Sequence, residues 1–227
     1  RSYIVGRLEK QRNIFEREQA VEKERSRISA ELHDDIGGGL TAIRLMSEML
    51  KERSKDESSR IFVNKISSSS NELVQKMNEI VWAMNINNDN LQSLISYTRE
   101  FSVSYMDDFN LDCKIELPEM IPDIPVIGAK RRDIFLLVKE ALNNIVKHAQ
   151  ATEVFISVRI GTDLQIEIAD NGKGFDPLKI RKNSNGMQNM RLRIERLHGR
   201  IQFKHNQGTS VIFEIPLKNL ADTDIKA

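Results

Sequence analysis

The sequence predicts two domains, a helical hairpin followed by an α/β sandwich with helices on one face of a mixed, mainly antiparallel sheet. The first half of the chain contains no proline between residues 4 and 107. The second half begins with Pro118, Pro122 and Pro125 and continues into alternating apolar and polar runs. Proline ends helices and alternation is typical of strands, so the change in pattern predicts a domain boundary near residue 109.

Two long amphipathic helices are predicted on either side of a polar turn at residues 52–60. Apolar residues recur at three- and four-residue steps in both helices, which places them on one face of each. These residues are Ile28, Leu32, Ile36, Leu40, Ile43, Met46 and Leu50, then Ile61, Ile66, Leu73, Met77, Ile80, Met84, Leu91 and Leu94. A hairpin with one apolar stripe buries that stripe by association, so we expect a homodimer that forms a four-helix bundle.

The remaining elements complete a plan of four segments. A charged helix over 1–25 is expected to be a coiled-coil or signalling linker, followed by the helical domain at 26–109, the sandwich at 110–220 and a tail at 221–227. The sandwich is predicted to contain helices at 134–148 and 186–198 and strands at 154–160, 164–169, 201–204 and 210–216.

Composition excludes several classes of protein. The chain has 34 basic and 33 acidic residues, so it lacks the basic excess of a general nucleic-acid binder. Its single cysteine, Cys113, excludes an internal disulfide framework and is typical of a reducing compartment. No apolar run approaches the ~20 residues that span a bilayer, so we expect a soluble cytoplasmic fragment of a longer protein.

One predicted helix carries residues suited to binding a metal ion and phosphate. Glu140, Asn144 and Lys147 follow one another at steps of four and three residues, so they share a helical face. A carboxylate and an amide oxygen are the hard ligands that Mg²⁺ prefers, and an ammonium can face phosphate. An ordinary solvated helix face would carry the same residue types, so this pattern alone leaves both interpretations open.

Three motifs, two of which contain glycine, favour one interpretation of these residues. The run from Glu140 to His148, the run Asp170-Asn-Gly172-Lys-Gly174, and Gly186-Met187 occur in this order. Together they resemble the ATP-binding domain shared by gyrase, Hsp90, MutL and sensor histidine kinases, the GHKL ATPase type. The resemblance implies that Asn144 coordinates Mg²⁺ with support from Glu140, that Lys147 contacts phosphate, and that His148 lies near phosphate or ribose.

The same resemblance implies roles for the residues that would surround the adenine base of ATP. A carboxylate at the end of a strand, Asp170, can accept a hydrogen bond from the adenine amino group, and Gly172 and Gly174 allow the backbone to come close. Gly186 and Met187 would begin a helix whose N-terminus faces phosphate, and Thr209 would support the adenine pocket. The segment 176–185 is the expected lid over the nucleotide.

A second motif lies within the first predicted helix. A lone His33 would ordinarily be a surface histidine, but the surrounding run from Glu24 to Asp34 resembles the phosphoacceptor box of histidine kinases that serve NarL-type response regulators. The resemblance implies that His33 is the nucleophile and that Asp34 orients its ring and favours its developing charge. It also implies a response-regulator partner, with a helix-turn-helix output, and a membrane-tethered parent protein.

The glycines at 37–39 differ from the residues that this branch of histidine kinases usually carries at these positions. Four residues after Asp34, relatives usually carry an amide that positions water for dephosphorylation of the partner, whereas this chain has Gly38. We therefore expect weak phosphatase activity or another route to it. Three consecutive glycines also weaken a helix by about 1 kcal/mol each relative to alanine, so we expect either a bend or another backbone that packs closely there.

The function that these features favour is the catalytic core of a two-component sensor histidine kinase. ATP would phosphorylate His33, and the phosphoryl group would pass to an aspartate of the response regulator. Two alternatives stay open at this point. One is an ATPase of the same superfamily that does not depend on His33, and the other is a degenerate, non-enzymatic dimeric scaffold.

Overall fold

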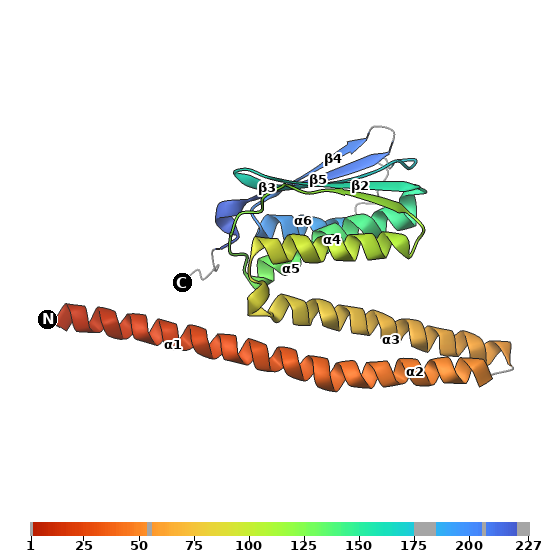
Figure 1. The fold of residues 1–227 in the computed structure, drawn as a ribbon, viewed down its shortest axis with the longest axis horizontal. Coiled ribbons are helices and arrows are strands. Elements are labelled where there is room, and N and C mark those ends of the chain that lie inside the picture. The colour runs from red at the N-terminus through yellow and green to blue at the C-terminus, as the bar shows by residue number, and fades with distance from the viewer. Residues whose placement is uncertain (1, 54–55, 175–184, 206–207, 222–227) are drawn as a thin grey trace. The chain divides into compact units, whose positions relative to one another are not determined.

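The computed structural model describes residues 2–53, 56–174, 185–205 and 208–221, and the chain divides into two compact units at Ile86 and Asn87. In the first unit, α1 (Ser2–Glu31) runs through a π-helical turn, η1 (Leu32–Gly37), into α2 (Gly38–Arg53). Helix α3 (Glu57–Met84) returns alongside α2 (Figure 1). This arrangement confirms the predicted hairpin of two long helices.

Local interactions define both ends of α3. At its start, the Asp56 carboxylate accepts a hydrogen bond from the Ser59 backbone N–H at 2.9 Å, and this capping lowers the pKa of Asp56. At its end, the carbonyls of Val81 and Ala83 accept hydrogen bonds from side chains of α1, Ser29 at 3.5 Å and Arg25 at 3.2 Å. The last turn of α3 is therefore tied to α1.

The three glycines do not interrupt the helix, because Gly37 ends the π-helical turn and Gly38 and Gly39 begin α2. A β-carbon at Gly37 would lie 2.8 Å from the terminal methyl carbon of Met77, so the close neighbour expected here is a side chain of α3 rather than another backbone. Nothing among the described residues lies within 4 Å of a β-carbon built at Gly38 or Gly39. These two positions can therefore accept larger side chains.

The second unit contains a five-stranded sheet in the order β1-β2-β3-β5-β4. Its strands are β1 (Asp112–Glu116), β2 (Glu153–Ile160), β3 (Asp163–Asp170), β4 (Arg200–His205) and β5 (Thr209–Pro216). Strand β1 pairs with β2 in parallel, and the other neighbouring pairs are antiparallel. The sheet is therefore mixed and mainly antiparallel, as predicted.

Three α-helices cover one face of this sheet (Figure 1). They are α4 (Leu91–Asp107), α5 (Gly128–Asn144), which continues into the π-helix η3 (Ile145–Ala149), and α6 (Asn185–Arg196). Fully buried side chains of the helices and the sheet form the core, among them Phe135, Leu137, Leu142, Ile168 and Phe213. The two 3₁₀ turns are η2 (Ile86–Asn88) and η4 (Leu217–Asn219).

Helix α4 corrects two expectations from the sequence. Leu91 and Leu94 were assigned to the second helix of the hairpin, but α3 ends at Met84 and both leucines are buried in the second unit. Asn90 starts the new helix, because its side chain accepts a hydrogen bond from the Ser93 N–H at 2.8 Å. The structural division therefore lies upstream of the boundary predicted near residue 109.

Strand β1 was also not predicted from the sequence.

None of the helices in the described part of the chain has a stretch long and apolar enough to cross a bilayer.

The start of the second unit is fixed by a buried ion pair. Arg131 of α5 is fully buried, and its guanidinium donates to the Asp89 carboxylate at 2.5 Å. Backbone hydrogen bonds from Val126 to Asp89 and from Leu91 to Ile124 join the same two segments. A buried cation depends on its counter-ion, so this pair anchors the chain where it enters the second unit.

We expect Asp89→Ala to lower the free energy of unfolding of the second unit by about 3 kcal/mol, because it leaves the Arg131 guanidinium buried without this carboxylate. Chemical denaturation followed by circular dichroism measures the change. The matched control is Lys114→Gln, which breaks an exposed ion pair with Glu153 at 3.2 Å and should cost less than about 1 kcal/mol. Equal losses in the two variants would contradict the anchoring role.

Candidate functional site

A cavity of about 420 Å³ opens in the second unit between α5–η3, the start of α6 and the strands β3, β4 and β5. Its volume lies in the range of small-molecule binding sites. The residues that line it are Glu140, Ala141, Asn143, Asn144, Ile145, Lys147, His148, Ala149, Ile168, Asp170, Gly174, Gly186, Met187, Met190, Phe203, Thr209 and Val211. All the predicted cofactor-binding residues except Gly172 are in this set, and so is Glu140.

The wall formed by α5 changes its helical geometry inside the pocket. Glu140 and Asn144 belong to α5, whereas Lys147 and His148 belong to the π-helix η3. A π-helical turn is wider than an α-helical one and is frequent at functional sites. Gln150 ends it in the left-handed conformation, with φ 53°. Four polar side chains therefore face one cavity although they do not share one regular helix.

Asp170 ends β3 at the opposite wall. Its carboxylate is half-buried and accepts a hydrogen bond from the Gly172 backbone N–H at 2.8 Å. Burial raises the pKa of Asp170, and hydrogen bonds from the backbone N–H groups of Gly172 and Thr209 partly oppose that shift. The second carboxylate oxygen adds a hydrogen-bond acceptor to the pocket wall.

The turn after Asp170 packs directly against the end of η3. A β-carbon at Gly172 would lie 2.2 Å from the carbonyl oxygen of Ala149, which only a glycine avoids. The Lys173 N–H donates to that same carbonyl at 2.9 Å. Gly174 has φ +68°, and a β-carbon there would meet the His205 ring at 1.9 Å. Gly172 therefore shapes the pocket from behind rather than lining it.

A row of apolar side chains forms part of the pocket across three adjacent strands. Ile168 of β3 pairs with Val211 of β5, and Val211 pairs with Phe203 of β4. Thr209 lies two residues before Val211 and therefore on the same face of β5. An apolar row beside a carboxylate and a hydroxyl can hold a flat heterocycle with a polar edge.

The start of α6 closes a further side of the pocket. Gly186 and Met187 lie in its first turn, and a β-carbon at Gly186 would meet Glu140 Oε1 at 2.0 Å. The backbone of α6 therefore runs close to the carboxylate of Glu140. Of the predicted lid at 176–185, residues 176–184 lie outside the described part of the chain, and Asn185 is the first residue of α6.

His33 and Asp34, the predicted phosphoacceptor and its neighbour, belong to the first unit. Their backbone forms part of the π-helical turn η1 between α1 and α2. The structure brings together most of the predicted nucleotide-binding residues in the second unit.

Sequence reasoning missed Asn143, Phe203 and His205. Asn143 adjoins Asn144 and accepts a hydrogen bond from the Tyr105 hydroxyl at 3.4 Å. Phe203 and Val211 alternate along their strands in the same way as core residues do, so only the strand register places them in a cavity. His205 carried no motif, and its proximity to Gly174 depends on the pairing of β4 with β5.

Known protein families match both the helical first unit and the second unit that contains the cavity. The family profile "Histidine kinase-, DNA gyrase B-, and HSP90-like ATPase" matches residues 129–219, and a "Histidine kinase" profile matches residues 24–89. The histidine kinase domain of the blue-light-activated kinase from Erythrobacter litoralis EL346 superposes with a TM-score of 0.53 at 16% identity, covering 82% of this chain and 99% of that one. This likeness supports the fold.

Curated relatives are similar in sequence over most of the chain. The nitrate/nitrite sensor NarX of Escherichia coli K12 is 29% identical over 89% of this chain and 34% of its own length. The histidine-protein kinase/phosphatase DegS of Brevibacillus brevis is 30% identical over 88% of this chain and 53% of its own length. This chain thus spans between a third and about half of these relatives.

With a histidine-kinase profile on its helical unit and an ATPase profile on its sheet unit, the chain belongs to the sensor histidine kinases of two-component systems, in the branch that includes NarX.

We expect Gly172→Ala to destabilise the second unit by roughly 1–3 kcal/mol and to weaken ATP binding, because the new methyl group must displace the Ala149 backbone. Thermal unfolding and equilibrium ATP binding measure the two effects. Gly161→Ala is the matched control, since nothing lies within 4 Å of a β-carbon at this turn between β2 and β3. Equal behaviour of the two variants would refute the close approach at Gly172.

Proposed function

We propose that this chain is the catalytic core of a histidine kinase that uses ATP to phosphorylate His33 and then passes the phosphoryl group to an aspartate of a response regulator. The observation that carries the proposal is the gathering of Glu140, Asn144, Lys147 and Asp170 around one cavity. The family membership supports it, because it places a histidine-kinase helical region before that cavity.

The pocket offers distinct surroundings for the two ends of ATP. The apolar row of Ile168, Val211 and Phe203 suits the adenine ring, and the Asp170 carboxylate can accept a hydrogen bond from its amino group. Guanine carries a carbonyl at that position, so a carboxylate there disfavours it. Lys147 and His148 line the part of the wall suited to ribose and phosphates.

The residues present also fit Mg²⁺. Asn144 and Glu140 supply an amide oxygen and a carboxylate to one cavity, and the phosphates and water would complete the six oxygen ligands that Mg²⁺ prefers. Among the described residues, no three His, Cys, Asp or Glu side chains gather into a metal cage of their own. Mg²⁺ would neutralise phosphate charge during transfer.

The phosphoryl transfer requires a neutral imidazole at His33. One ring nitrogen attacks the γ-phosphorus, a nitrogen–phosphorus bond forms, and the bond from phosphorus to the bridging oxygen breaks as ADP leaves. Asp34 accepts the proton of the other ring nitrogen in a hydrogen bond, which fixes the tautomer and stabilises the charge that develops on the ring. Glu140 orients the surroundings of the reacting phosphate.

Exposed apolar residues on the hairpin support a homodimer. Met46, Leu50, Ile61 and Phe62 are 62%, 58%, 60% and 69% exposed in the single chain. Pairing two hairpins into a four-helix bundle would bury this stripe. We also place the core on the cytoplasmic side of a membrane-tethered parent protein, with a response regulator of helix-turn-helix output as its partner.

The chain with γ-labelled ATP and Mg²⁺ should acquire an acid-labile, alkali-stable label, because phosphohistidine has this stability. His33→Gln should acquire none, whereas the control His198→Asn should label normally. Hydrolysis of ATP without label on any of these proteins would favour the ATPase alternative. A chain that binds no nucleotide at all would favour the scaffold alternative.

A second experiment addresses dephosphorylation of the partner. We expect Gly38→Gln to increase the rate at which the chain dephosphorylates the response regulator, because it restores an amide four residues after Asp34. The side chain has room, since nothing among the described residues lies within 4 Å of a β-carbon there. Gly39→Gln is the matched control, with equal space and an equal gain in helix propensity. No increase with Gly38→Gln, or an equal increase with both, would contradict the role of this position.

A further inference from the structure

Asn171 occupies a special place in the turn that shapes the pocket. It lies between Asp170, whose carboxylate lines the cavity, and Gly172, whose backbone packs against Ala149. Its own side chain is exposed and is not among the side chains that line the cavity. Any effect of Asn171 on a bound nucleotide must therefore pass through its neighbours.

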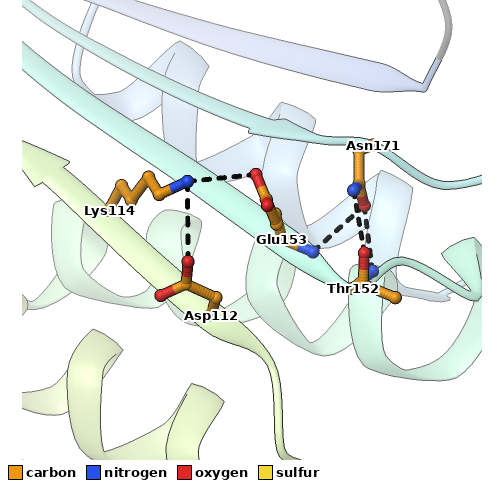
Figure 2. A network of polar contacts seen from close by, with 5 residues as sticks. All are labelled: Asp112, Lys114, Thr152, Glu153 and Asn171. Carbon is orange, nitrogen blue, oxygen red and sulfur yellow. Dashed lines mark hydrogen bonds and ion pairs between the residues drawn. The ribbon is translucent and has the colours of Figure 1, made fainter.

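The Asn171 side chain binds the beginning of β2 through three hydrogen bonds (Figure 2). Its Oδ1 accepts from the backbone N–H groups of Thr152 and Glu153, at 2.9 and 3.0 Å. Its Nδ2 donates to Thr152 Oγ1 at 2.9 Å. Three of the four hydrogen bonds that an amide side chain can make are thus formed with two adjacent residues.

These bonds begin where the regular sheet ends. The pairing of β2 with β3 stops at Val154 and Asp170. Beyond this point the Asn171 N–H still donates to the Glu153 carbonyl at 3.3 Å, and the Asn171 side chain accepts hydrogen bonds from the N–H groups of Thr152 and Glu153. Asn171 therefore extends the attachment of the two strands by one step past Asp170.

The other side of the turn is attached separately. The Lys173 N–H donates to the Ala149 carbonyl, and the Asp170 carboxylate accepts from the Gly172 N–H within the turn. Asp170 is consequently held by its pairing with Val154 on one side, and the turn that follows it is anchored at Asn171 and at Lys173. Loss of the Asn171 side-chain bonds would leave the turn directly after Asp170 attached mainly at Lys173, so the direction of the Asp170 carboxylate would be fixed less firmly.

We propose that Asn171 is a positioning residue that aims the Asp170 carboxylate at the 6-amino group of adenine. This inference rests on the proposed binding of ATP in the cavity. Its consequence is selective, because misdirection of Asp170 affects a nucleotide that carries the amino group and spares one that lacks it.

The test compares dissociation constants for ATP and for purine riboside triphosphate, which has hydrogen in place of the amino group. The chain should prefer ATP, and Asn171→Ala should reduce that preference about tenfold, as expected for a lost hydrogen bond to a charged acceptor. Asn171→Asp should retain most of the preference, since its carboxylate can still accept from both backbone N–H groups and from the Thr152 hydroxyl.

Two further variants keep the result interpretable. Lys114→Gln removes the neighbouring contact with Glu153 shown in Figure 2 and should leave the preference unchanged. Thr152→Val removes only the hydroxyl and should reduce the preference by a smaller factor than Asn171→Ala, so it provides the test if the alanine variant does not fold.

An equal loss of affinity for both nucleotides in Asn171→Ala would assign Asn171 a merely structural role and overturn the inference. An unaltered preference in both Asn171→Ala and Thr152→Val would overturn it as well. A chain with no preference for ATP before any substitution would instead overturn the proposed role of Asp170, and this inference with it.

Discussion

The close approach between the turn after β3 and the end of the π-helix η3 is the contact on which the pocket depends. Gly172 leaves no room for a side chain beside the Ala149 carbonyl, and Lys173 donates a hydrogen bond to that same oxygen. Asp170 lies on one side of this contact, and Lys147 on the other side precedes Ala149 by two residues. A shift in the contact would therefore move the surroundings of the base and of the phosphates together. Phosphoryl transfer is catalysed mainly by positioning and electrostatics, so a rigid connection of this kind suits it.

Most of the fold follows from sequence periodicity. The structure differs from the prediction in two places, and each difference has an identifiable cause. Leu91 and Leu94 continue the three- and four-residue spacing of α3, so the pattern alone does not separate them from it. The separation depends on the Asn90 cap and on burial of both leucines in the second unit. Strand β1 (Asp112–Glu116) alternates exposed and half-buried residues, but it has only five residues and pairs in parallel with β2, which begins at Glu153. A local pattern cannot reveal a partner at that distance.

The polar half of the site was predictable because its residues occur in compact motifs. Two of these motifs, at 170–174 and 186–187, contain glycines whose positions have no room for a β-carbon. The apolar half was not predictable, because Phe203 and Val211 have the same alternation as the core and enter the cavity only through the register of β4, β5 and β3. The side-chain bonds of Asn171 were missed for a similar reason, since its partners Thr152 and Glu153 lie just before and at the start of β2, 19 and 18 residues away in the sequence.

The central claim is that the cavity binds ATP through recognition of adenine by Asp170. Isothermal titration of the chain with ATP and with GTP, in the presence of Mg²⁺ and beside Asp170→Asn, tests it most directly. The account predicts that the unchanged chain binds ATP much more tightly than GTP and that Asp170→Asn loses most of this selectivity. Equal affinities for the two nucleotides, or selectivity that survives in Asp170→Asn, would contradict the account.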